Sequence, residues 1–78
     1  MKFEIKAYFN GLNPDYPGYT LFSAQKVGQD NLSSKIFIYA ARKFEPGDTV
    51  SNDKLEPLPY TISCHQVYLL TDTPKLKH

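Results

Sequence analysis

The chain has 78 residues, one cysteine and nine Lys or Arg against eight Asp or Glu, which gives a formal net charge of +1. A chain of this length makes one small domain, and its single cysteine excludes an intramolecular disulfide. So small a net charge excludes strong non-specific attraction to nucleic acid or to anionic membranes. We predict one compact domain over residues 1–71, followed by a polar tail over 72–78.

The first segment, "KFEIKAYF", alternates apolar and polar side chains with a period of two. This period predicts an amphipathic strand with one buried face. The buried face would carry Phe3, Ile5, Ala7 and Phe9, and the outer face Lys2, Glu4, Lys6 and Tyr8. The next stretch, residues 10–18, contains two prolines and predicts a rigid surface loop. Because "MKFEIKAYF" lacks the apolar segment of a signal peptide and no run is long enough for a membrane span, we expect a cytoplasmic protein.

Two further strands are expected in the middle of the chain. "YTLFSAQKV" at 19–27 is the second, and a polar connection follows at 28–34. The segment "KIFIYAARKF" at 35–44 is rich in β-branched and aromatic residues on both faces, which favours a central strand. The alternative is a helix over about 30–44, capped at Asp30, which would pack on an antiparallel sheet and make the fold α+β.

The last third contains turn signals and a long apolar segment. "FEPGDTV" at 44–50 predicts a turn that leads into a short strand. "SNDKLEPLP" at 51–59 predicts a second proline-bearing loop, and "YTISCHQVYLLT" at 60–71 a long final strand in the centre of the sheet. The chain is thus predicted to be all-β, a small barrel or sandwich of four or five antiparallel strands.

Cys64 and His65 are neighbours within that final strand, so their side chains should point to opposite faces. Cys64 would share a face with large apolar residues and be buried. His65 would lie on the other face beside the hydroxyls of Thr61 and Ser63. Adjacent strand residues do not converge on one substrate atom or metal ion, so we predict neither a nucleophile nor a metal site here.

No other motif points to catalysis. The carboxylates fall mostly in predicted turns, where they serve backbone hydrogen bonding. Asp48, Asp53 and Glu56 lack the spacing of a calcium loop, and no glycine-rich phosphate loop is present. We therefore expect no enzyme activity, no metal and no cofactor.

One functional hypothesis is an OB-like domain that binds single-stranded nucleic acid. Such domains stack bases on strand aromatics beside a basic groove. The residues available for this role are Lys2, Lys6 and Tyr8 on the first strand, Tyr39 or Phe37 with Arg42 and Lys43 further on, and the tail residues Lys75 and Lys77.

The favoured hypothesis is a non-enzymatic protein-interaction module that occupies the surface of another protein. Examples are a regulator, an inhibitor such as one encoded by a phage or mobile element, and an accessory subunit. Tyrosine is favoured at interfaces, and Tyr16 lies between two prolines that stiffen its loop. The expected binding residues are Asp15, Tyr16, Pro17 and Tyr19. Alternatively, Tyr16 folds back as a lid on the core. A homodimer through an exposed strand edge is a further hypothesis.

Overall fold

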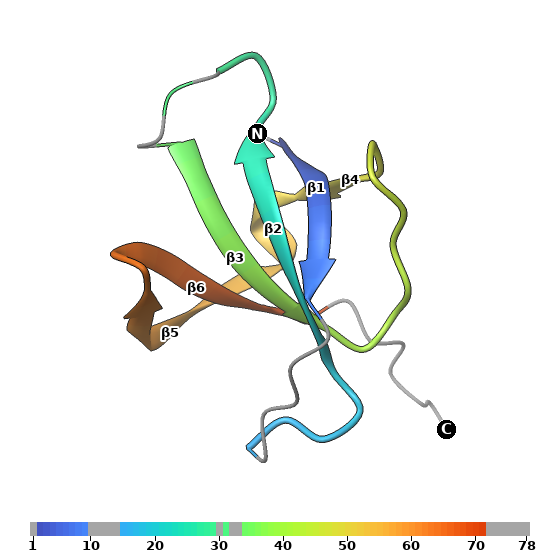
Figure 1. The fold of residues 1–78 in the computed structure, drawn as a ribbon, viewed down its shortest axis with the longest axis vertical. Coiled ribbons are helices and arrows are strands. Elements are labelled where there is room, and N and C mark those ends of the chain that lie inside the picture. Colours follow the sequence, from blue (N-terminus) through green and yellow to red (C-terminus); the bar gives the residue numbers. More distant parts are fainter. Residues whose placement is uncertain (1, 10–14, 30, 32–33, 72–78) are drawn as a thin grey trace.

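The computed structural model describes residues 2–9, 15–29, 31 and 34–71, and within them the chain forms one six-stranded sheet (Figure 1). The strands are β1 Lys2–Phe9, β2 Thr20–Lys26, β3 Lys35–Ala40, β4 Thr49–Ser51, β5 Leu55–Ile62 and β6 His65–Leu70, with a 3₁₀ turn, η2, at Asn52–Lys54. The all-β prediction is confirmed, with six strands in place of four or five. The helix considered for 30–44 is wrong, because β3 occupies its centre.

The sheet has the order β4-β1-β2-β3-β6-β5, and every neighbouring pair is antiparallel except β3 and β6. The two edge strands, β4 and β5, are separated in the chain only by η2. The sheet therefore curls until its edges approach each other at one corner, as Figure 1 shows. It does not close into a barrel; the packing is sandwich-like.

The main core lies on the inner face of this curl. Its buried members come from five strands or the links between them, because alternate positions of each strand point inward. They are Phe3, Ile5, Phe22, Ala24, Ile36, Ile38, Ala40, Phe44, Val50 and Leu70, with Leu55 and Tyr68 partly buried against them. We call this set the main core. Burial of such large side chains is the dominant stabilising contribution in a domain this small.

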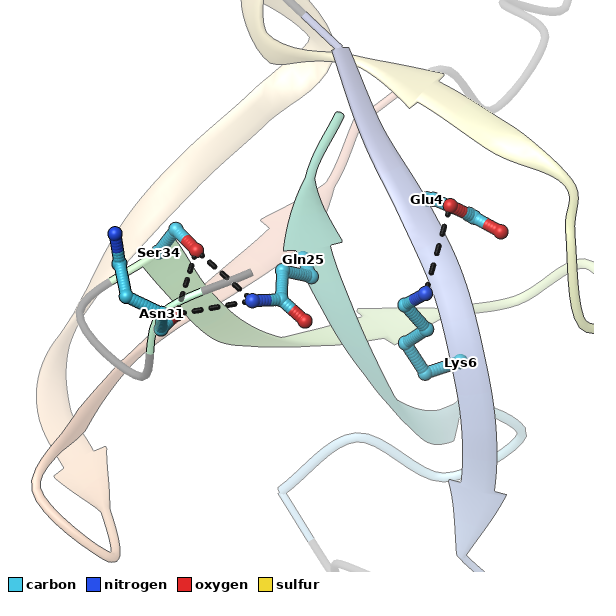
Figure 2. Close-up of polar contacts among 5 residues, drawn as sticks. All are labelled: Glu4, Lys6, Gln25, Asn31 and Ser34. Carbon is cyan, nitrogen blue, oxygen red and sulfur yellow. Dashed lines mark hydrogen bonds and ion pairs between the residues drawn. The ribbon is translucent and has the colours of Figure 1, made fainter. Parts of the chain in front are cut away.

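A β-bulge in β1 changes the predicted alternation of that strand. The pairing with β2 shifts between Ile5 and Ala7. Beyond the shift, Tyr8 pairs with Phe22 and therefore lies on the main-core side of the sheet, while Phe9 lies on the opposite side. The prediction that Ala7 and Phe9 are buried is wrong, because the extra residue inverts the faces of everything after it. Lys6, within the shifted segment, forms an ion pair with Glu4 at 3.5 Å (Figure 2).

A second correction concerns the last third of the chain. The predicted loop at 51–59 contains most of β5, and the predicted strand at 60–71 is divided between β5 and β6. Pro57 and Pro59 were read as loop signals. They are tolerated here because β5 is an edge strand, where a missing N–H need not break a ladder on both sides. Of the final strand predicted to be central, β6 is interior, between β3 and β5, whereas residues 60–62 lie on the edge strand β5.

Ser63 and Cys64 form the two-residue turn between β5 and β6. Both have positive φ, 52° and 69°, and Ile62 pairs with His65 across them. Positive φ at both central residues is the signature of a type I′ hairpin turn. Cys64 is exposed, so its predicted burial is wrong. His65 lies beside the Phe37 ring at 6.1 Å rather than on a polar face.

Hydrogen bonds secure the connection between β2 and β3. Gln25 Nε2 donates to the backbone oxygen of Asn31 at 2.9 Å and to Ser34 Oγ at 3.0 Å, and Ser34 Oγ donates to the same Asn31 oxygen at 2.7 Å (Figure 2). Ser34 is buried, so these bonds satisfy a hydroxyl that would otherwise be costly to bury. They hold the start of β3, and with it Lys35, in place.

The predicted turn before β4 is confirmed. The Asp48 N–H donates to the Glu45 carbonyl at 3.0 Å, and the Glu45 N–H donates to the Asp48 carboxylate at 2.9 Å. Gly47 between them has φ of 100°, which favours glycine. Other predictions, namely the loop residues before Asp15, the Asp30 cap and the tail at 72–78 with Lys75 and Lys77, lie outside the described residues. In the described part of the chain, no helix has the length and apolarity needed to cross a membrane.

Candidate functional site

A second apolar cluster lies on the face of the sheet opposite the main core. Its centre is formed by three buried residues of β3 and β6, and residues from β2, β5, β6 and the segment before β2 pack around them. The buried members are Phe37, Tyr39 and Val67, and the partly buried ones are Tyr16, Tyr19, Leu21, Leu58, Ile62 and Leu69. We call this cluster, together with the adjoining Phe9 and Tyr60, the aromatic face.

The aromatic face has two layers of rings. Phe37 and Tyr39, on the central strand β3, form the inner layer. Phe9 covers Phe37 with ring centroids 5.9 Å apart, and Tyr16 stacks on Tyr39 at 5.1 Å. Tyr19 meets Tyr16 edge to face at 6.0 Å. Rings packed in this way are held in defined orientations, so the outer layer is a pre-formed aromatic surface.

Tyr60, near the end of β5, extends this surface and is 37% exposed. A side-chain hydrogen bond joins its hydroxyl to that of Tyr39. Partial burial, the neighbouring Tyr39 and that hydrogen bond together raise the pKa of Tyr60 to about 12. The phenol is therefore neutral throughout the physiological range. It supplies a ring and a neutral hydroxyl to the aromatic face.

Positive charge lies at one end of this face. Lys35, the first residue of β3, places its Nζ over the Phe37 ring at 5.4 Å from the centroid. His65 approaches the same ring from β6. The carboxylates nearby are Asp15, next to Tyr16, and Glu56, which pairs with Leu69. The face thus combines rings and a lysine with two acidic groups elsewhere on its border.

The structure brings together some of the residues expected to bind a partner. Tyr16 and Tyr19 belong to the aromatic face with Tyr39, which sequence reasoning had assigned to the nucleic-acid hypothesis. Asp15 and Pro17 flank Tyr16 in the same loop and are exposed. Tyr16 is half-buried against Tyr39, so it covers the second cluster in the manner of the lid considered above.

Phe37, also named for the nucleic-acid hypothesis, lies at the centre of the aromatic face, whereas the expected basic residues lie elsewhere. Lys2, Arg42 and Lys43 line a separate groove. Lys2, Lys6 and Tyr8 were expected to share the outer face of the first strand. That expectation is wrong, because the bulge in β1 places Tyr8 on the main-core side.

Sequence reasoning missed the two exposed rings of the aromatic face, Phe9 and Tyr60, and Lys35 beside it. Phe9 was placed in the core by extrapolating the period of two through the bulge. Tyr60 was placed in a central strand, although it lies on the edge strand β5. Lys35 was treated only as the start of a strand. Its position directly before the alternating pair Phe37 and Tyr39 was the signal available, since residues 35, 37 and 39 of one strand share a face.

The Cys64–His65 pair lines a shallow cavity of ≈ 610 Å³, and Lys26, Lys35 and Gln66 line it as well. Cys64 belongs to the turn and His65 to β6, where its ring contacts Phe37. Among the residues that the structure describes, no three His, Cys, Asp or Glu gather in a way that would hold a metal ion.

Comparison with protein-family models, with curated proteins and with solved structures found no match to this chain.

Proposed function

We propose that the protein binds single-stranded nucleic acid, with bases stacked on the aromatic face. The observation that carries the proposal is the pre-formed outer layer of Phe9, Tyr16 and Tyr19 over Phe37 and Tyr39. Proteins that bind single strands combine such stacking platforms with positively charged groups that follow the backbone. Every base has an aromatic surface, so binding of this kind tolerates many sequences.

Charge supports the same function. Lys35 lies over the Phe37 ring and adds a positive charge at one end of the aromatic face. A flexible lysine stem suits contact with a backbone phosphate as a point charge. Asp15 and Glu56 oppose this attraction at the border of the face, so stacking rather than charge supplies most of the expected affinity.

The architecture of the sheet is also analogous to that of OB-type domains. OB-type domains are small, partly open five-stranded barrels that bind oligonucleotides on the face of their second and third strands and on two adjoining loops. If β4, η2 and β5 are counted as one interrupted strand, this sheet also has five. The aromatic face is centred on β3, has one member on β2, extends over β5 and β6, and is bordered by the loop before β2. Fold alone does not establish function, so the analogy has weight only beside the residues.

The test is binding of a fluorescein-labelled oligothymidylate of about 16 nucleotides, a length that spans one such site. Phe9→Ala and Tyr60→Ala should each weaken binding by about 5- to 150-fold, since stacking contributes roughly 1–3 kcal/mol per base. Tyr8→Ala is the matched control. Tyr8 is the neighbour of Phe9 and is more exposed, 59% against 43%, but lies on the other side of the sheet.

Unchanged binding by Tyr8→Ala, with losses for Phe9→Ala and Tyr60→Ala, supports the proposal. No binding by the wild-type protein, or equal losses for all three variants, would overturn it. Circular dichroism of each variant shows whether the fold is retained.

The same surface supports a second candidate, the protein-interaction module expected from the sequence. The half-buried Tyr16 and Tyr19, with Asp15 and Pro17 beside them, offer rigid rings and a polar rim. A protein partner captured with nuclease present, and released by Tyr19→Ala in a folded variant, would favour this candidate. Recovery that disappears with nuclease would favour nucleic acid. A homodimer through a strand edge stays a prediction; the edges are the three-residue β4 and the proline-bearing β5.

A further inference from the structure

A basic groove of ≈ 610 Å³ lies apart from the aromatic face. Four basic residues line the groove: Lys2, Arg42, Lys43 and Lys54. Among the residues that the structure describes, Asp48 is the one acidic residue in the lining. Its apolar floor is Phe44, Val50 and Leu70, which belong to the main core. The groove and the aromatic face share no residue.

Three separate segments bring the four cations together. Lys2 begins β1 and pairs with Ser51 of β4, so the start of β1 lies beside the chain that leads into η2 and Lys54. Arg42 and Lys43 follow β3, and the Arg42 guanidinium lies over the Phe44 ring at 5.3 Å from its centroid. The fold therefore gathers positive charge that is dispersed in the sequence.

The acidic groups near the groove are already engaged locally. The Asp48 carboxylate accepts a hydrogen bond from the Glu45 N–H, within the turn that precedes β4. Asp53, next to Lys54, accepts a hydrogen bond from the Ser51 hydroxyl, and this bond is the main cause that lowers the pKa of Asp53 below its ordinary value. Both carboxylates are thus fixed in turns, while the lining retains an excess of positive charge.

The groove suits phosphates better than bases. Its aromatic residue, Phe44, is buried beneath the groove and capped by Arg42, so it offers no exposed ring for stacking. Several cations spread along an open groove match a chain of phosphates better than one isolated anion. Lysines provide mobile point charges for such contacts, and the arginine adds a fixed fork.

We propose that this groove binds backbone phosphates of a nucleic-acid strand, without reading its sequence. The inference rests on the proposed function and deepens it, because it assigns the electrostatic contacts to a surface distinct from the stacking surface. The affinity of the protein should then fall with salt chiefly through Lys2, Arg42, Lys43 and Lys54.

The experiment measures the affinity for the same labelled oligothymidylate as a function of salt. For single strands the slope of log K against log salt is about −0.7 per phosphate contact. Lys43→Gln/Lys54→Gln removes two exposed cations, so its slope should be shallower by about 1.4. The loss of affinity between about 50 and about 200 mM salt then becomes about sevenfold smaller. Lys6→Gln, which removes an exposed cation of β1 outside the groove, should leave the slope unchanged.

The outcomes separate the two proposals. If Phe9→Ala weakens binding but the double lysine variant keeps the wild-type slope, the groove inference is overturned and the proposed function stands. If Lys6→Gln changes the slope as much per charge as the double variant does, general charge rather than the groove is responsible, which also overturns the inference. If the wild-type protein does not bind the oligonucleotide, the proposed function itself fails. Competition by tripolyphosphate that acts only through Lys43 and Lys54 would support the groove directly.

Discussion

Ile62 of β5 and His65 of β6 pair directly across a two-residue turn, so Ser63 and Cys64 form the tip of a hairpin. This relationship explains why the one cysteine is exposed. It also explains why His65 contacts Phe37 on the aromatic face rather than its neighbour in the sequence. In the hairpin, Cys64 and His65 have separate structural surroundings.

The Ser63–Cys64 turn predicts a stabilising substitution. Left-handed backbone costs an L-residue about 1–2 kcal/mol, and Asn-Gly is the preferred pair for this turn type. Ser63→Asn/Cys64→Gly should therefore stabilise the protein by about 1 kcal/mol and raise Tm by about 4–8 °C. Thermal unfolding followed by circular dichroism measures the change.

Cys64→Ala is the control for this substitution, because it removes the thiol but keeps a side chain at positive φ. It should leave Tm within a few degrees of wild type, since exposed substitutions rarely exceed about 0.5 kcal/mol. An equal rise in Tm for both variants would mean that the thiol, and not the backbone, is the source of the effect.

Gln66 secures the irregular part of β5. The pairing of β5 with β6 shifts between Pro57 and Thr61, and Gln66 Nε2 donates there to the Leu58 carbonyl at 2.8 Å and to the Val67 carbonyl at 2.9 Å. Gln66→Ala should lower the free energy of unfolding by about 1–3 kcal/mol, at about 0.5–1.5 kcal/mol per hydrogen bond. Urea denaturation measures this change.

Two further variants sharpen that test. Gln66→Glu should cost more than Gln66→Ala, because a carboxylate would face two carbonyl oxygens without a donor. Gln29→Ala, at an exposed position beyond the end of β2, should change stability little. Wild-type stability for Gln66→Ala would show that the bulge is held by the backbone alone.

The raised pKa of Tyr60 leads us to expect a loss of stability in alkaline solution. Its pKa is about 12 in the folded protein and about 10 in an unfolded chain. Between these values the unfolded chain releases the phenol proton that the folded protein keeps. The contribution of Tyr60 to the free energy of unfolding is therefore fully present below about pH 10 and is lost as the pH rises through about 12. Urea denaturation between about pH 9 and about pH 12 should show this fall.

In Tyr60→Phe this part of the alkaline destabilisation should disappear. Ultraviolet titration of the wild-type protein should also show one phenol that ionises at higher pH than in Tyr60→Phe. If the variant loses stability over the same pH range to the same extent as wild type, the raised pKa does not belong to Tyr60.

Local patterns were enough for much of the architecture. The β-branched and aromatic residues of 35–44 predicted β3, the segment 19–27 predicted β2, and the Pro-Gly-Asp sequence predicted the turn before β4. These features depend on side-chain propensity and turn chemistry over a few residues, which are visible in one sequence. Tyr16, Tyr19 and Tyr39 were also recognised as candidate binding residues, although for two different functions.

Pairing between distant segments decided the rest. The bulge in β1 is a mismatch with β2, so no pattern within "KFEIKAYF" shows that Tyr8 and Phe9 exchange sides. Pro57 and Pro59 are compatible with a strand only because β5 lies at a sheet edge, which is a property of the whole topology. The basic groove likewise exists only after β1 and β4 pair and bring Lys2 toward Lys54. The sequence by itself determined most of the extended segments, with β5 as the exception, and where some turns lie. The tertiary structure alone decided which side chains meet, because register and strand order arise from contacts between residues far apart in the chain.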